Sequence, residues 1–350
     1  MRSIWVRGLA ACASVLFALS ACAAGEGGPQ TLTVMTHDSF SMSEDVLASF
    51  ERAHNTEVVF LQSGDAGAAL NKAILLKDSP LADLFFGVDN TFLSRALEAG
   101  IFEQYQPAEL PLIPEEFRLD ATNRLFPVDY GDVCINYDRQ YFAEHNLPVP
   151  DSLEDLTRPA YDGLLVVENP ATSSTGLAFL LATRAHFGHD YLQFWAGLKD
   201  NRVTVVDGWE TAYYANFSGS SGRGDQPMVV SYASSPAAEV IFADPPRDDA
   251  PTASITADDT CFRQVEFVGI LKGARQRGLA EEMVSFMLDV QFQEDVPLQM
   301  FVFPVRPEAV LPEAFVEHAA RPLQPAAIDP AEIAANRDRW ISEWTQLMFG

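Results

Sequence analysis

The chain has 350 residues, of which 48% are hydrophobic and 21% are charged, and its 49 acidic residues outnumber its 23 basic ones, for a formal net charge of −26. This length exceeds what a single hydrophobic core usually encloses, so two domains or lobes are expected. The negative charge argues against a nucleic-acid partner and mildly favours a cationic one.

The first residues are typical of a secretion signal. Arg2 and Arg7 precede an apolar stretch from Leu9 to Leu19. This stretch is shorter than the ~20 residues that a membrane-spanning helix needs. We therefore expect residues 1–21 to be a signal peptide. No second hydrophobic span follows in the sequence.

The end of this signal, LSAC at Leu19–Cys22, resembles the bacterial lipobox, in which the chain is cut before a cysteine that is then lipidated. Cys22 would then be the lipidated first residue, and residues 22–30 would form a flexible tether. We expect an extracytoplasmic lipoprotein, anchored in a membrane by its lipid. Removal of residues 1–21 takes away Arg2 and Arg7, so the mature chain would have 21 basic and 49 acidic residues. An ordinary signal peptide with a cysteine in its cleavage region is the alternative.

The first ninety residues predict an alternation of strands and helices. Each strand is followed by a small polar turn, with Asp38, Asp65 or Asp89 at or near its carboxyl end. Open α/β sheets bind ligands at that end of their strands. The predicted strands are Thr31–Thr36, Glu57–Gln62 and Leu81–Gly87, and the predicted helices are Ser43–Ala53 and Ala68–Leu76.

The second half predicts another α/β unit between two crossing segments. The crossings are the apolar, β-rich stretches Phe126–Tyr137 and Phe262–Ile270. Trp340 and Trp344 stand at i,i+4 spacing in a C-terminal helix and are expected to lie in the core. The other predicted elements are strands at 164–168, 203–206 and 228–232, helices at 279–288 and 330–348, and flexible loops at 218–224 and 245–251.

A run of hydroxyl side chains opens the stretch Asn169–Gly188, before apolar residues at helical spacing. Such residues commonly cap a helix N-terminus. They can also line a ligand site, because the first N–H groups of a helix have no partner within it. Both interpretations stay open at this point.

Two cysteines remain after the N-terminal segment, Cys134 and Cys261. In an oxidising compartment a disulfide between them is a reasonable expectation, and two are too few for a zinc cluster. His186 and His189 lie near a predicted helix end and are expected to be surface residues rather than metal ligands.

These elements predict two α/β lobes whose strand-end turns face one cleft. This is the type II-like plan of periplasmic binding proteins, whose lobes close on a ligand by hinge motion. We expect lobe 1 to comprise residues 31–131 with about 268–310, and lobe 2 residues 132–267. The helical segment 311–350 is not assigned to either lobe.

Several short motifs, weak alone, stand in a characteristic order and spacing between about Leu32 and Met348. The chain thereby resembles the thiamine-binding proteins that serve ABC-type importers. The motifs are THDSF at 36–40, GDAG at 64–67, GVDN at 87–90, PVDYG at 127–131, NPATSSTG at 169–176, VTVVDGWETAY at 203–213, VSYASSP at 230–236 and WISEW at 340–344.

The resemblance implies a set of ligand contacts. Thiamine carries an aminopyrimidine, a thiazolium cation and a hydroxyethyl arm, which call for aromatic faces, a carboxylate and polar donors. In the family, the positions of Trp209 and Tyr232 contact the rings. The other implied contacts are Asp38 and Ser39 from lobe 1, and Asp65, Ala66, Ser173 and Ser174 toward the polar arm at helix N-termini.

The chain also departs from the family. His37 and Ala238 stand where the family often has tyrosine, so binding could be weaker or the ligand different. Asp89 and Asp129 are expected to shape turns or brace the site. The resemblance implies capture of thiamine or a thiamine phosphate and delivery to a membrane permease, by a monomer without catalytic activity or cofactor.

Three alternatives stay open. The adjacent pair Tyr213 and Tyr214 resembles the tyrosines with which ferric-binding proteins hold Fe(III). A polyamine would also suit an acidic, aromatic cleft. A thiamine-degrading enzyme of the same two-lobed plan would need Cys134 as nucleophile, with Glu266 as a possible base, and a disulfide at Cys134 would abolish that role.

Overall fold

The structure, a computed structural model, describes residues 29–221 and 224–350. The predicted signal peptide and Cys22 lie outside the described residues. Within the described part, no helix is both long enough and apolar enough to cross a membrane.

The described chain forms one mixed ten-stranded sheet with the order β2-β1-β3-β9-β4-β7-β5-β6, and β8 and β10 both pair with β4. The strands are β1 (Gln30–Thr36), β2 (Thr56–Gln62), β3 (Leu84–Asp89), β4 (Phe126–Asp138), β5 (Leu165–Glu168), β6 (Thr204–Val206), β7 (Met228–Tyr232), β8 (Thr252–Ile255), β9 (Phe262–Ile270) and β10 (Phe303–Pro304).

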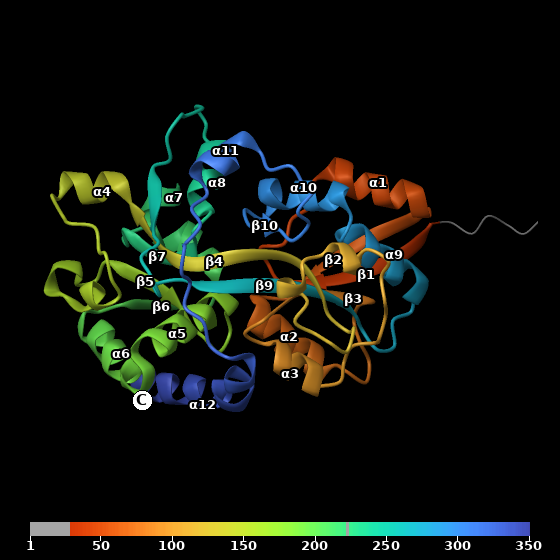
Figure 1. The fold of residues 1–350 in the computed structure, drawn as a ribbon, viewed down its shortest axis with the longest axis horizontal. Coiled ribbons are helices and arrows are strands. Elements are labelled where there is room, and N and C mark those ends of the chain that lie inside the picture. The colour runs from red at the N-terminus through yellow and green to blue at the C-terminus, as the bar shows by residue number, and fades with distance from the viewer. Residues whose placement is uncertain (1–28, 222–223) are drawn as a thin grey trace, which may run out of the picture.

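Two parallel groups of strands are joined by two long antiparallel ones. Strand β1 pairs in parallel with β2 and β3, and β5 pairs in parallel with β6 and β7. Strands β4 and β9 are antiparallel to each other and link the groups, and Figure 1 shows them side by side across the middle of the molecule. The two predicted crossing segments are therefore confirmed.

Helices cover both groups. They are α1 (Glu44–His54), α2 (Ala66–Leu75), α3 (Leu93–Glu98), α4 (Arg139–Glu144), α5 (Ser174–Phe187), α6 (Tyr191–Asp200), α7 (Ser218–Ser221), α8 (Ser235–Ile241), α9 (Arg277–Met287), α10 (Val290–Gln299), α11 (Glu313–His318) and α12 (Pro330–Phe349). A π-helix spans Thr211–Asn216, and short 3-10 turns lie at 110–112, 115–117, 154–157, 159–161 and 188–190.

Local capping explains where the helices at the strand ends begin. The Ser43 hydroxyl accepts the Val46 N–H at the start of α1, and Asp65 accepts the Ala66 N–H at the start of α2. The Ser173 hydroxyl accepts the Gly176 N–H at the start of α5. N-capping is thus one confirmed role within the hydroxyl run.

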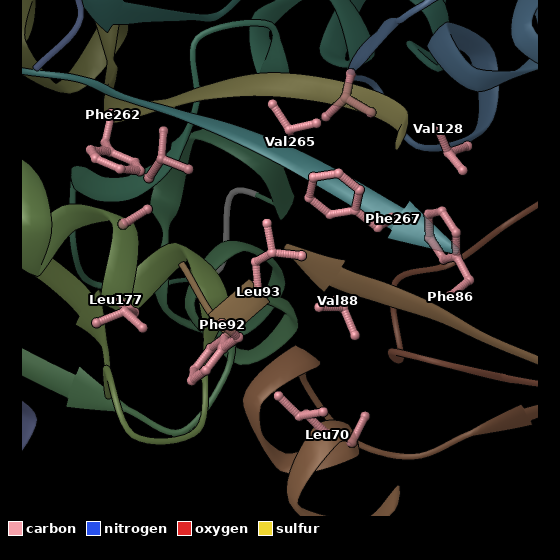
Figure 2. Close-up of a cluster of buried hydrophobic side chains, with 14 of the residues drawn as sticks. Leu70, Phe86, Val88, Phe92, Leu93, Val128, Leu177, Phe262, Val265 and Phe267 are labelled. Atoms are coloured by element: carbon pink, nitrogen blue, oxygen red, sulfur yellow. The ribbon is translucent and has the colours of Figure 1, made fainter. Parts of the chain in front are cut away.

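The core continues from one strand group to the other. Every residue of β3 is buried, as expected for a central strand covered on both faces. Figure 2 shows this apolar cluster extending from Leu70 on α2, past Phe86 and Phe267, to Leu177 on α5. The turns at the strand ends therefore follow strands and helices that are packed in one continuous core.

The C-terminal helix α12 contacts elements that belong to both strand groups. Trp340 and Trp344 are 1% and 0% exposed, which confirms the predicted core positions. The Trp344 ring meets that of Trp195 on α6 edge to face at 5.4 Å. Arg337 of the same helix lies over the Phe92 ring beside α3. Helix α12 (blue in Figure 1) thus spans from α6 toward α3.

Several predicted boundaries are wrong. The third strand is Leu84–Asp89 rather than Leu81–Gly87, because Leu81 is 51% exposed and Asp89 continues the pairing with β9. Helix α2 begins at Ala66, two residues earlier than predicted, because Asp65 caps it. The predicted loop 218–224 begins with the short helix α7. Strand β8 follows the predicted loop 245–251 and was missed.

Candidate functional site

A cavity lies where the turns after β1, β2, β6 and β7 meet the N-terminus of α5. It holds about 620 Å³ of empty space, part of it open to solvent. Its lining comes from both strand groups, from β9 and from the segment after α10: His37, Ser39, Asp65, Ser174, Thr175, Trp209, Glu210, Tyr214, Tyr232, Glu266, Gln299, Met300, Phe301 and Val302.

Asp65 joins three chain segments at the cavity wall. Its Oδ1 accepts the backbone N–H of Ala66 at 2.6 Å and that of Ser174 at 3.2 Å, and its Oδ2 accepts the N–H of Trp209 at 2.9 Å. Burial raises the pKa of Asp65, while these N–H donors act in the opposite direction. The Asp65 carboxylate therefore accepts hydrogen bonds from N–H groups at the starts of α2 and α5, so these N–H groups are not free to bind a ligand.

Aromatic rings form another part of the cavity wall. The indole N–H of Trp209 donates to the Ser231 hydroxyl at 2.8 Å, and one face of the indole stacks on Tyr213 at 5.0 Å. The Tyr232 ring centroid lies 6.4 Å from that of Trp209, and its hydroxyl donates to Gln264. A side chain at Gly131 would place a Cβ 2.6 Å from the Tyr232 ring, so a glycine is needed there.

A row of carboxyl groups lies across the sheet, and one member of it, Glu266, lines the cavity. Glu266 on β9 is paired in register with Asp89 on β3 and with Asp129 on β4. Burial raises the pKa of Asp89 to about 7, and burial together with Glu266 raises that of Asp129 well above its ordinary value. His37 faces Glu266 across 3.4 Å, from Nε2 to Oε1.

The charge of the lining favours a cation. Asp65, Glu210 and Glu266 all border the cavity, and no lysine or arginine is found among the described residues that line it. The ionisable group of opposite sign in this lining is His37. A cation with aromatic rings fits such a lining through ring stacking and charge attraction.

The residues predicted from the sequence fall into three groups. Those that line the cavity are Ser39, Asp65, Ser174, Trp209 and Tyr232. Asp38 lies in an adjoining hollow and accepts the Gly64 N–H at 2.8 Å. Ala66 and Ser173 are buried and outside the described lining of the cavity.

Two other parts of the lining, Glu210 and residues 299–302, had no sequence prediction. Glu210 follows Trp209 directly, so the motif GWE already placed it beside the site. Residues 299–302 comprise the last residue of α10 and the segment after it, carry no recognisable motif, and include Phe301 with a positive φ of 58°. Ala238 lies outside this cavity, in a neighbouring hollow that Trp209 and Tyr214 also line.

The structure also shows the surroundings of the residues that the iron-binding and thiamine-degrading alternatives would use. Cys134 and Cys261 form a disulfide, so the Cys134 sulfur is not a free thiol. The Tyr213 hydroxyl donates to Glu239 at 2.7 Å. Within the described chain no group of three His, Cys, Asp or Glu side chains is placed to hold a metal ion. His186 pairs with Glu154, away from the cavity.

Comparison with known proteins gives a family and a set of relatives. The family model described as bacterial extracellular solute-binding protein matches residues 79–330. Thiamine-binding periplasmic proteins of Salmonella typhimurium and Escherichia coli are each 30% identical over 92% of this chain and 95% of their own length. That of Brucella suis is 29% identical over 94% of this chain and 95% of its own length.

Solved structures share the fold. A periplasmic thiamin binding protein superposes with a TM-score of 0.80 and 28% identity, over 92% of this chain and 97% of that one. Iron-bound HitA from Pseudomonas aeruginosa superposes with a TM-score of 0.72 and 18% identity, over 91% of this chain and 99% of that one. The two-lobed α/β fold expected from the sequence is thereby confirmed.

Proposed function

Because the chain belongs to the bacterial extracellular solute-binding proteins, we propose that it captures thiamine or a thiamine phosphate outside the cytoplasm and delivers it to an ABC-type importer. The relatives named for thiamine binding cover nearly the whole chain and support this choice of ligand. The separate permease would receive the ligand from the closed binding protein.

The observation that carries the proposal is the composition of the cavity. Trp209 and Tyr232 present aromatic surface, and Glu266 and Glu210 present carboxylates to the same space. A thiazolium desolvated against an aromatic face gains on the order of 1–2 kcal/mol, and the carboxylates supply its counter-charge. Thiamine combines these features in one small molecule.

Hydroxyl groups offer a place for the polar arm. Ser174 and Thr175 border the cavity at the first turn of α5. The Ser174 N–H is bonded to Asp65, so the hydroxyl of the arm would meet Asp65 and these hydroxyls together, whereas the negative charge of a phosphate would be repelled by the Asp65 carboxylate. We propose ligand contacts for Asp38, Ser39, Asp65, Ser174, Trp209 and Tyr232. Ala66 and Ser173, which the resemblance also implies as contacts, lie buried outside this lining, where Ser173 caps α5 and the Ala66 N–H donates to Asp65.

We propose that the two strand groups act as the lobes. Lobe 1 would comprise residues 31–131 with about 268–310, and lobe 2 residues 132–267. Strands β4 and β9 would bend during closure, since they are the sheet connections between the groups. Segment 311–350 would bridge the lobes through α12, which touches α6 and Phe92.

We further propose anchoring by a lipid on Cys22 and a monomeric, non-catalytic mode of action. A lipid anchor would keep the receptor near its permease. The Cys134 disulfide supports a binding role, because it occupies the sulfur that the thiamine-degrading alternative would use as its nucleophile.

The test is calorimetric titration of the mature domain, freed of carried-over ligand, with thiamine, thiamine monophosphate and thiamine diphosphate. Mass spectrometry then checks that the ligand is recovered intact. We expect tight binding of unchanged ligand. Fe(III) and spermidine serve as comparison ligands, and preferential binding of either, or consumption of thiamine, would contradict the proposal.

A further inference from the structure

His37 occupies a space that the sheet leaves open for its ring. Gly87 on β3 has a φ of 108°, and a Cβ there would lie 2.5 Å from the His37 Cδ2. The ring also lies against Phe86, with centroids 5.5 Å apart, and the side chain is 12% exposed. The imidazole is therefore fixed at the cavity wall with Nε2 toward Glu266.

Several acidic groups from different elements lie near this imidazole. Glu266 on β9 is nearest, at 3.4 Å, Asp38 is its chain neighbour, Asp65 lies at the start of α2 and Glu210 follows β6. Asp89 and Asp129 stand beside Glu266 in the neighbouring strands. Burial alone would lower the pKa of His37, but Glu266, then Asp65 and Asp38, outweigh it, and the pKa is raised.

A charged His37 and a cationic ligand would compete for the same carboxylate. Both Glu266 and His37 border the cavity, so a cation held by Glu266 lies within a few ångströms of the imidazole. Two positive charges at that distance repel each other strongly in a partly desolvated site. The ring is confined by Gly87 and Phe86, so loss of the proton relieves the repulsion without moving the side chain.

We infer that His37 is a specificity-determining residue that holds Glu266 as an imidazolium in the free protein and releases its Nε2 proton to solvent when a permanent organic cation binds. The inference rests on the proposed function, since thiamine carries such a charge. The only chemical step is transfer of this proton from Nε2 to the buffer. No covalent bond to the ligand forms, and nothing is oxidised or reduced.

Two measurable consequences follow. Binding of a cation becomes tighter as pH rises through the His37 pKa, by at most about tenfold per pH unit, because one proton is exchanged. A neutral ligand of the same shape leaves the proton in place. Selectivity for the cation over the neutral analogue therefore increases with pH over the same range.

The test is titration with thiamine from about pH 6 to about pH 8, in pairs of buffers that differ in ionisation enthalpy, so that released protons are counted directly. We expect release of up to one proton per thiamine by the wild type, and none attributable to this site in His37→Gln. His186→Gln is the matched control, since His186 also pairs with a glutamate but lies away from the cavity. Thiamine's own titration is common to all variants.

Asp89→Asn and Asp129→Asn test the two other proton sources near Glu266. Loss of the proton release in either variant, with its retention in His37→Gln, would overturn the assignment to His37. An NMR titration of the His37 ring in the wild type, with and without thiamine, gives the same answer if a variant does not fold. We expect saturation with thiamine to lower the His37 pKa.

The outcomes separate this inference from the proposed function. Tight thiamine binding with the same pH dependence in the wild type and His37→Gln would contradict the role of His37 and leave the function standing. Failure of both proteins to bind thiamine at every pH would instead contradict the function.

Discussion

Substitution of Asp65 by asparagine perturbs the junction of the three segments at the cavity wall. The amide can keep Oδ1 as acceptor for Ala66 and Ser174, but it places an NH₂ against the Trp209 N–H and loses that 2.9 Å bond. Ser174 and Trp209 stand 109 and 144 residues away from Asp65 in the sequence, and their bonds to it join the two strand groups.

The free energy lost in Asp65→Asn is expected to be that of one hydrogen bond to a charged acceptor, which is about 1.5–3 kcal/mol. Burial raises the pKa of Asp65, which shows that its charge carries a desolvation penalty and places the loss near the lower end. Because this bond holds Trp209 of one strand group against Asp65 of the other at the cavity wall, its loss is expected to lower thiamine affinity by about 10-fold or more, since 1.4 kcal/mol is a factor of ten.

Calorimetric titration of Asp65→Asn with thiamine measures the change in affinity. X-ray scattering of the free protein shows whether the two strand groups close on each other. Asp120→Asn is the matched control, because Asp120 is buried and accepts the Thr122, Arg124 and Leu125 N–H groups outside the cavity lining. Asp120→Asn should lose stability and keep its affinity. Unchanged affinity in Asp65→Asn would refute the reasoning.

Three further predictions test other parts of the account. Trp209→Ala should weaken thiamine binding about 5- to 30-fold by titration, with Trp209→Phe between it and the wild type, and equal affinity in all three would exclude a ring contact. Because burial raises the pKa of Asp89 to about 7, the folded protein keeps a proton that the unfolded chain releases above about pH 4, so the free energy of unfolding should fall by up to about 4 kcal/mol between about pH 4 and 7. Denaturant unfolding at a series of pH values should show a weaker dependence of the unfolding free energy on pH in Asp89→Asn than in the wild type. The same dependence in both proteins would be evidence against a buried proton on Asp89. Joint replacement of Cys134 and Cys261 by serine should lower the free energy of unfolding by about 2–5 kcal/mol and leave thiamine affinity unchanged, whereas lost affinity would tie the disulfide to the site.

Much of the fold was predictable because the central strands are buried on both faces. Such strands appear as continuous apolar runs, and Phe126–Tyr137 differs from the true β4 by a single residue at its end. The carboxyl end of β3 was misplaced because the acid Asp89 interrupts the apolar pattern although it is fully buried. Its bonds to Thr91 and Gln264 satisfy it there.

The site was predictable where the motifs lie at strand ends, as at Asp65, Trp209 and Tyr232. The motifs did not indicate which residues of a helix N-terminus face the cavity, so Ala66 and Ser173 were included although both are buried outside its lining. Such a choice depends on helix phase, which a motif of small residues does not fix.

Other site features depend on sheet register. Glu266 was singled out only as a possible base for the enzyme alternative, and the carboxyl row exists because β9 pairs Glu266 with Asp89 and Asp129. Partners far apart in sequence are not visible from local pattern. The segment 299–302 reaches the cavity only because the chain after α10 returns to it.

The central claim is that the cavity captures an intact organic cation by aromatic contact and counter-charge. The most direct measurement compares, by titration of the mature domain, thiamine with a reduced analogue whose sulfur ring carries no fixed charge. The account predicts that thiamine binds much more tightly and that Glu266→Gln reduces this preference. Equal affinity for the two compounds in the wild type would contradict it.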